Sequence, residues 1–218
     1  MPSFLTEDGS HSFISEQFGV AYHSIHGAIQ ETCHVFIDSG LSFVHKQNVS
    51  KINVLELGFG TGLNALMTYI EAEKLGLDIH YITYEKYPLS MDEVLRLNYP
   101  TLLGIEDTVF NKLHNCTWNE CHTISPFFSL EKRFMSFEEI DIQNEINLIY
   151  FDAFEPETQP QLWEQPMMQK MYDALQANGV LTTYCAKGVV KRTLKSVGFT
   201  LHSLPGPIGK REMTRAIK

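Results

Sequence analysis

Cysteine and long hydrophobic runs are both scarce in this sequence. Its 218 residues contain four cysteines, too few and too scattered for a disulfide framework. No stretch approaches 18 uninterrupted apolar residues, and the start of the chain shows neither the basic nor the apolar segment of an export signal. We therefore expect reduced thiols, no membrane span and a soluble, cytoplasmic protein.

Nothing in the sequence divides it into domains. It has no repeat, no low-complexity tract and no linker, and 218 residues of 44% hydrophobic composition can bury little more than one core. We predict a single domain over 1–218, with an N-terminal cap or hairpin region at 1–48 and an α/β core at 49–218. Within the cap region, the run Thr32 to Ile37 indicates a strand.

Metal-ligating side chains form no convincing set. Cys116 and Cys121, with the flanking His114 and His122, could be interpreted as zinc ligands, but this C-x4-C spacing has no second pair. An ordinary loop that holds thiols and imidazoles is the favoured interpretation, and we expect no metal.

Basic residues are the minority, and the net charge of −9 argues against a nucleic-acid partner. Their distribution changes this view. From Lys187 to Lys218 there are eight Lys or Arg against one acid, a net charge of +7, so 1–186 carries −16. This basic segment suits a phosphate backbone, although a solvated helix face followed by a charged last strand remains an alternative.

Strand and helix signals alternate from residue 53 onward. Strands are predicted at 53–57, 79–85, 146–151 and 180–184, and helices at 63–75, 88–97 and 162–175, the last ended by Asn178-Gly179 as a C-cap. A closing helix (189–197), strand (199–204), Pro/Gly loop and strand (212–217) suggest a last strand that is inserted antiparallel. The alternation predicts a Rossmann-like α/β fold with a mostly parallel sheet.

A glycine-rich turn, Glu56-Leu-Gly-Phe-Gly-Thr-Gly62, lies between the first strand and its helix. Glycines without Cβ let the backbone approach a ligand at a helix N-terminus. A dinucleotide fingerprint would need a small residue where Leu63 stands. Because an acid at the strand end suits an amino group and a sulfonium, we favour S-adenosylmethionine over a dinucleotide or a purely structural turn.

Two further acids end predicted strands. Glu85 lies 23 residues beyond Gly62, where a carboxylate can accept hydrogen bonds from both ribose hydroxyls of a nucleoside cofactor. Asp152 follows Ile146–Phe151 at the edge of the sheet where ligands bind, and we expect it to face the reacting centre. The alternatives are a solvated strand end for Glu85 and a helix N-cap for Asp152.

These motifs resemble the methyltransferase part of the tRNA 5-methylaminomethyl-2-thiouridine biosynthesis enzymes, of the MnmC N-terminal or stand-alone MnmD type. The resemblance covers nearly the whole chain. It rests most specifically on Phe151-Asp-Ala-Phe154 and Lys210-Arg-Glu-Met213, and also on Tyr22-His-Ser24, Glu31, the glycine turn and Tyr84-Glu-Lys86.

The resemblance implies S-adenosylmethionine-dependent methylation of the primary amine of 5-aminomethyl-(2-thio)uridine at the tRNA wobble position. Asp152 would be the catalytic residue, lying between cofactor and amine. The cofactor would be bound by Glu56, Gly58, Gly60, Gly62, Asn64, Glu85, Lys86 and Asp152. The anticodon stem-loop would be contacted by Tyr22, His23, Phe154, Trp163, Lys191, Arg192, Lys210 and Arg211.

The sequence departs from the family pattern in two ways. Ser136 stands where many members have the acid of a Gly-Asp pair, which would weaken a contact to adenine. No second glycine-rich fingerprint follows, so we expect no FAD domain in this chain and a separate flavin-dependent or other enzyme upstream. Alternative functions are a small-amine methyltransferase or aminopropyltransferase-like enzyme, or a catalytically inactive RNA-binding module.

Overall fold

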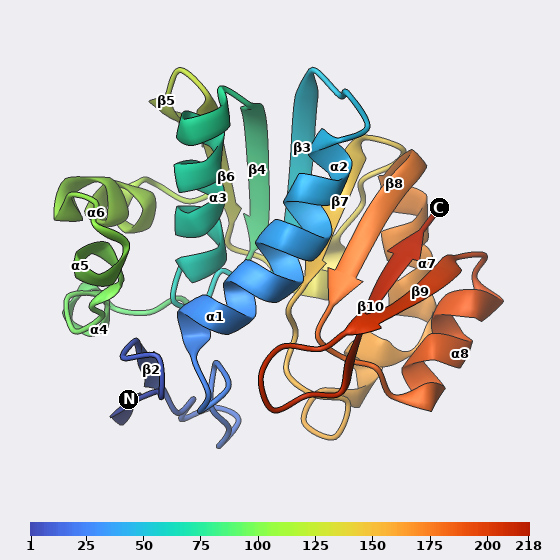
Figure 1. The fold of residues 1–218 in the computed structure, drawn as a ribbon, viewed down its shortest axis with the longest axis horizontal. Coiled ribbons are helices and arrows are strands. Elements are labelled where there is room, and N and C mark those ends of the chain that lie inside the picture. Colours follow the sequence, from blue (N-terminus) through green and yellow to red (C-terminus); the bar gives the residue numbers. More distant parts are fainter.

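The computed structural model describes all residues 1–218 as a mixed eight-stranded sheet with helices on both faces (Figure 1). The strand order is β5-β6-β4-β3-β7-β8-β10-β9. The strands are β3 (Lys51–Leu57), β4 (Asp78–Tyr84), β5 (Cys121–Ser125), β6 (Phe128–Arg133), β7 (Ile146–Phe151), β8 (Leu175–Thr183), β9 (Thr200–Pro205) and β10 (Glu212–Ile217).

The five strands from β6 to β8 are parallel, whereas β10 is inserted antiparallel between β8 and β9. This arrangement confirms the predicted Rossmann-like methyltransferase fold. The β5–β6 hairpin, which extends the other edge of the sheet, was not expected from the sequence.

Alternate residues of the central strands bury opposite faces of the sheet. On β7, Leu148 and Tyr150 belong to one hydrophobic cluster and Ile149 and Phe151 to the other. The first cluster packs under the N-terminal helices, α3 (Leu63–Leu75) and α6 (Asp107–Asn115). The second packs under α7 (Gln165–Ala174) and α8 (Gly188–Ser196). Four of the parallel strands, β3, β4, β7 and β8, therefore contribute to both clusters, whereas β6 contributes only to the first.

The N-terminal region begins with a hairpin of β1 (Ser3–Leu5) and β2 (His11–Phe13). It continues as an unbroken helical run of α1 (Ala28–Thr32), the π-helical η1 (Cys33–Leu41) and α2 (Ser42–His45), which crosses the sheet (Figure 1). The predicted strand at Thr32–Ile37 is therefore wrong. Buried residues recur every four positions, a helical period that a six-residue window misses: Ala28, Thr32, Phe36, Gly40 and Val44.

Two helix predictions also need correction. The expected helix 88–97 is reduced to α4 (Met91–Val94), which begins after a capping box of Ser90 and Glu93; α5 (Tyr99–Leu103) follows it.

Asn178 is not part of a helix C-cap, because α7 ends at Ala174 and β8 already runs through this position. Its positive φ of 64° lies in a stretch where the β7–β8 register shifts, so the turn signal marks an irregularity in the strand.

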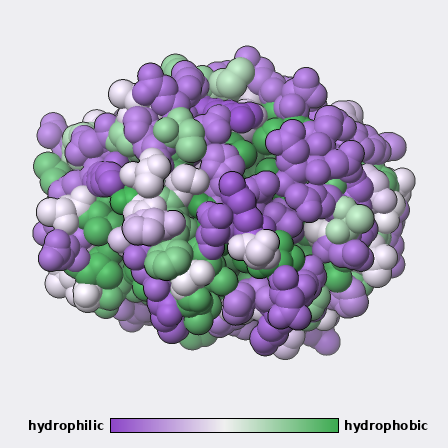
Figure 2. Space-filling view, turned by 90° about the horizontal axis from the view of Figure 1, so that it is seen from above, coloured by the Kyte–Doolittle hydropathy of each residue, from purple (hydrophilic) through white to green (hydrophobic).

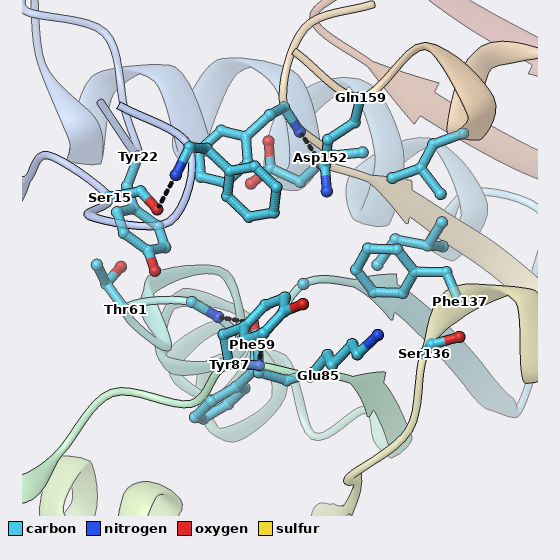
Figure 3. Close-up of a pocket in the computed structure, with 18 of the residues that line it drawn as sticks. Ser15, Tyr22, Phe59, Thr61, Glu85, Tyr87, Ser136, Phe137, Asp152 and Gln159 are labelled. Atoms are coloured by element: carbon cyan, nitrogen blue, oxygen red, sulfur yellow. Dashed lines mark hydrogen bonds between the residues drawn. The ribbon is translucent and has the colours of Figure 1, made fainter. Parts of the chain in front are cut away.

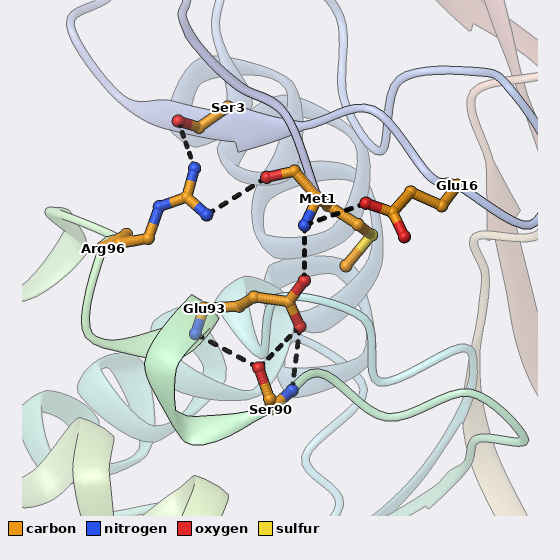
Figure 4. Close-up of polar contacts among 6 residues, drawn as sticks. All are labelled: Met1, Ser3, Glu16, Ser90, Glu93 and Arg96. Atoms are coloured by element: carbon orange, nitrogen blue, oxygen red, sulfur yellow. Dashed lines mark hydrogen bonds and ion pairs between the residues drawn. The ribbon is translucent and has the colours of Figure 1, made fainter.

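The first strand is fastened to α4 (Figure 4). The amino group of Met1 lies 2.8 Å from the Glu93 carboxylate, and Arg96 donates hydrogen bonds to the Met1 carbonyl and the Ser3 hydroxyl. These contacts place the hairpin and the loop after it at the carboxyl ends of the strands.

Hydrophilic side chains predominate on the face shown in Figure 2, and hydrophobic ones emerge in separate patches. None of the helices combines the length and the apolar character that crossing a membrane requires.

Candidate active site

A cavity lies at the carboxyl ends of β3, β4 and β7. In Figure 3, Tyr22 and Ser15 of the N-terminal region flank it on one side, and Ser136 and Phe137 flank it on another. Glu85 and Asp152 face each other across it, at the ends of β4 and β7. Ligands of parallel α/β sheets bind in this position.

The glycine turn forms one wall of the cavity in a backbone conformation that favours glycine. Gly58, Gly60 and Gly62 have φ values of 91°, 49° and 73°. A Cβ at Gly62 would lie 2.6 Å from Nε2 of His114, so this glycine is needed for packing. A Cβ at Gly58 would meet only Phe137 at 3.9 Å, so the missing side chain leaves room toward the cavity.

Glu85 is held by two backbone N–H groups. Its carboxylate accepts hydrogen bonds from Gly60 at 3.1 Å and from Tyr87 at 2.7 Å. Burial raises the pKa of Glu85, and these hydrogen bonds oppose the rise. The carboxylate is therefore fixed before any ligand arrives, beside Lys86, which also lines the cavity.

Glu56 lies beneath the turn and does not line the cavity. It is fully buried, both of its carboxylate oxygens lack a hydrogen-bond partner, and burial raises its pKa well above the usual range. Gly62 is likewise a packing residue. The two were predicted as cofactor contacts, but the structure places them behind the wall that Gly58, Gly60 and Asn64 present.

Asp152 and Asn64 form the centre of the site. The Asn64 side-chain amide donates a hydrogen bond to Asp152 at 2.8 Å, while its oxygen accepts one from the Thr32 hydroxyl at 3.0 Å. Burial raises the pKa of Asp152 to about 7, the negative charge of Glu31 adds to the rise, and the Asn64 hydrogen bond and Lys210 oppose it. Asp152 can therefore exchange a proton near neutral pH.

A second cavity meets the first at Asp152. Both are lined by Tyr22, His23, Asp152, Ala153 and Phe154, and the second continues to Glu31, Tyr184 and Lys210. Asp152 thus stands where a ligand in one cavity would meet a ligand in the other. The second cavity combines carboxylates with aromatic rings, a lining that suits a cationic amine carried on a planar group.

Aromatic rings narrow the passage between the cavities. The Phe154 ring lies 5.4 Å from that of Tyr22 and 5.0 Å from that of Phe18. Burial raises the pKa of Tyr22 to about 12 and lowers that of His23 to about 4, so both side chains are neutral near pH 7. Nδ1 of His23 lies 3.0 Å from the Ser12 hydroxyl, which fixes the ring.

The remaining predicted tRNA contacts lie outside the first cavity. Trp163 lines neither cavity, is 4% exposed and donates its indole N–H to the Phe154 carbonyl at 2.8 Å, so it supports the loop after β7. Lys191 forms an ion pair with Glu212 at 2.8 Å, and Lys210 forms one with Glu31 at 2.7 Å. Arg192 and Arg211 form no ion pair.

Sequence reasoning missed several cavity residues, most of them in loops without a motif: Phe18, Tyr87, Phe137, Glu138 and Gln159. Glu138 is informative because it lies two residues after Ser136, accepts a hydrogen bond from the Ser136 hydroxyl at 2.6 Å and lines the cavity. An acid is therefore present close to Ser136, where the family pattern has one. The Ser136-x-x-Glu139 capping-box pattern was the signal that could have located this turn.

No group of three or more His, Cys, Asp or Glu side chains is placed to hold a metal ion. Cys121 is exposed and Cys116 donates to the Leu113 carbonyl at 3.3 Å, so the two thiols have separate surroundings.

Comparison with known proteins agrees with this geometry. A family model described as S-adenosyl-L-methionine-dependent methyltransferase matches residues 132–218. The tRNA 5-methylaminomethyl-2-thiouridine biosynthesis bifunctional protein MnmC of Leptospira interrogans is 29% identical over 211 residues, 92% of this chain and 33% of that protein. The protein of the same name from Actinobacillus pleuropneumoniae is 25% identical over 96% of this chain and 34% of its own length.

Among solved structures, MnmC2 of Aquifex aeolicus has a TM-score of 0.79 at 23% identity, covering 98% of this chain and 68% of that chain. Spermidine synthase of Thermotoga maritima has a TM-score of 0.58 at 17% identity, over 100% of this chain and 72% of that one. These likenesses concern the fold. The chain spans about a third of the length of the curated relatives it matches, and over that part it is similar to the MnmC proteins and, at residues 132–218, to the S-adenosyl-L-methionine-dependent methyltransferase family model.

Proposed function

We propose that this protein methylates the primary amine of 5-aminomethyl-(2-thio)uridine at the wobble position of tRNA. The observation that carries the proposal is the position of Asp152 at the junction of two cavities, one with a glycine-turn wall and one lined by carboxylates and aromatic rings. The relatives are named for biosynthesis of a methylaminomethyl nucleoside, which is the product of such a transfer.

The first cavity fits S-adenosylmethionine. The gap left by Gly58 admits a ligand close to the backbone, Glu85 presents a fixed carboxylate for ribose hydroxyls, and Ser136 and Glu138 offer acceptors for an adenine amino group. When bound, the cofactor supplies an electrophilic methyl group on a sulfonium.

Asp152 orients the acceptor amine and receives its proton. An amine with a lysine-like pKa of about 10.4 is neutral in only about one molecule in 10³ at pH 7, a cost of roughly 4 to 5 kcal/mol. A carboxylate whose pKa is about 7 is ionised often enough to accept the proton and is basic enough to hold it. Asn64 fixes this carboxylate, so that it faces both cavities in one orientation.

The tRNA backbone would approach along the basic C-terminal segment. Arg192 and Arg211 form no salt bridge, whereas Lys191 and Lys210 do, so the two arginines are the first candidates for phosphate contacts. Lys191 and Lys210 could join them only by leaving their present ion pairs. The aminomethyl group itself would have to be present on the uridine before methyl transfer.

The test is methylation of tRNA from a strain that lacks this modification, with labelled S-adenosylmethionine and nucleoside analysis of the product. We expect label in 5-methylaminomethyl-(2-thio)uridine. Label transferred to free polyamines but not to tRNA would favour the small-amine enzyme, and tRNA binding without turnover or cofactor binding would favour the inactive module.

A further inference from the structure

Glu31 and Lys210 form an ion pair in the wall of the second cavity, although 179 positions separate them in the sequence. Nζ of Lys210 lies 2.7 Å from Oε1 of Glu31, whose side chain is only 9% exposed. The other oxygen of Glu31 accepts a hydrogen bond from the Ser24 backbone at 3.0 Å. Nζ of Lys210 also lies 3.8 Å from the centre of the Tyr184 ring. Both charges are therefore held in place rather than free in solvent.

Both charges act on Asp152, which lines the same cavity. The charge of Glu31 favours the protonated form of Asp152 and that of Lys210 favours the ionised form, while burial has the largest effect on its pKa. Because the two charges are opposite, the charge of Lys210 offsets part of the effect of Glu31 on Asp152, and the effect of Glu31 is the larger.

The other titratable groups around Asp152 do not supply a charge that could take over the effect of Glu31 or Lys210 on its pKa. Glu56 from β3 has a strongly raised pKa, and Tyr22, Tyr81, Tyr184 and His23 are neutral near pH 7 because burial shifts their pKa values away from it. Glu85 faces the cofactor side and is bound by backbone N–H groups. Glu155 is 59% exposed at the rim, near Lys187 at 3.7 Å.

We propose that Glu31 and Lys210 are positioning residues that act as a pair to keep Asp152 able to accept the proton of the acceptor amine. The proposal rests on the role of Asp152 proposed above. Without Lys210, two carboxylates would share one cavity, and Asp152 would retain its proton to higher pH. Without Glu31, an uncompensated ammonium would hold Asp152 ionised and reduce its basicity. Lys210 is thereby assigned to the acceptor cavity rather than to the tRNA backbone.

The experiment is a direct titration of Asp152 by NMR in protein labelled with ¹³C at the aspartate carboxyl carbons. Asp152→Asn identifies the signal by its loss. We expect Lys210→Met to raise the midpoint and Glu31→Gln to lower it, with the larger shift in Glu31→Gln because the charge of Glu31 has the larger effect on Asp152. The double variant Glu31→Gln/Lys210→Met should have a midpoint between those of the two single variants.

Two controls separate this effect from a general loss of structure. Lys210→Arg keeps the charge and should keep the wild-type midpoint, and Lys191→Met removes a comparable Lys–Glu pair outside both cavities and should not move it. Melting curves at one pH show whether each variant is folded. An unchanged midpoint in both folded single variants would overturn the proposal and leave the pair as a fastening of the N-terminal region.

The titration requires neither cofactor nor tRNA, so an error in the proposed substrate does not affect it. If tRNA is the acceptor, the acidic limb of kcat/KM for methylation should move in the same direction as the NMR midpoint in each variant.

Discussion

The first cavity, which we propose as the cofactor half of the site, and the second cavity, which we propose as the acceptor half, are built in different ways. The cofactor half consists mainly of one backbone turn after β3 and a carboxylate after β4, held by main-chain hydrogen bonds. The acceptor half is assembled from side chains of four separate segments: Glu31, Asp152, Tyr184 and Lys210. Substitutions in the first half should therefore act through shape and those in the second through charge.

The largest expected effect is on the group that the two halves share. Asp152→Ala should lower kcat for methyl transfer by about 10² to 10⁴, because it removes the proposed proton acceptor, while adenosylhomocysteine binding changes little. Single-turnover methylation and calorimetry measure the two quantities, and Asp141→Ala, an exposed acid, is the matched control. If Asp152→Ala lost cofactor binding but had normal turnover at saturating cofactor, the role of Asp152 would be to bind the cofactor and not to accept a proton.

The next effect tests shape in the cofactor half. Gly60 has a φ of 49°, and a Cβ there would lie 3.2 Å from the Tyr22 ring, so Gly60→Val should distort the turn and abolish stabilisation by adenosylhomocysteine. In the wild type that stabilisation should be about 2.7 kcal/mol at a ligand concentration of 100 Kd. Gly76→Val introduces a similar backbone strain at a φ of 64° outside the cavity, and it should lower Tm but keep the ligand-induced shift.

A smaller effect concerns charge and stability. The pKa of Asp152 is about 7 in the folded protein and lower in the unfolded chain. At a pH between these two pKa values, Asp152 is protonated in the folded protein but has lost its proton in the unfolded chain. Stability should fall as pH rises through this window and remain lower above it. Asp152→Asn should therefore melt at a higher temperature than the wild type at pH 8, with a difference that shrinks toward pH 4. If the variant and the wild type melted at the same temperature at pH 8 as well as at pH 4, burial of the ionised Asp152 carboxylate would not destabilise the protein.

The smallest effect is expected at the surface. If Arg192 and Arg211 each bind a phosphate of the tRNA, Arg192→Glu and Arg211→Glu should each raise KM for tRNA. Each should also reduce the salt dependence by about 0.7 to 0.9 log units per tenfold change in salt for every phosphate that is no longer bound. Lys195→Glu, on the same helix as Arg192, tests whether the loss of any basic residue of that helix raises KM for tRNA equally. Unchanged KM and slope in both arginine variants would leave these charges as a solvated face.

The glycine turn and the two acids after β4 and β7 could be located from the sequence because their signals are local, whereas Phe18, Tyr87 and Glu138, which line the same cavity, belong to no motif. Helix 63–75 has the predicted bounds, and Glu85 and Asp152 end strands as expected. The acceptor half could not be predicted from the sequence, because no local pattern links Glu31 to Lys210. The charge of Lys210 suggested a phosphate contact, because a sequence does not show which acid lies beside a lysine.

The errors in the fold have the same origin. The six residues Thr32–Ile37 are β-branched, aromatic or small enough to suggest a strand, and tertiary packing against β7 and β8 gives them a helical conformation instead. The turn signal at Asn178 was real, but it marks a positive φ within β8 rather than the end of a helix.

The insertion of β10 between β8 and β9 has a consequence for the order in which the site is completed during synthesis. The glycine turn, Glu85 and Asp152 leave the ribosome well before Lys210, and β10 pairs with two strands that precede it in the chain. Because chains fold from the N-terminus as they emerge, a nascent chain can shape the first cavity while the position of β10 between β8 and β9 is still vacant. The loop that carries Lys210 reaches Glu31 only when that position is filled, so the second cavity is completed after the first.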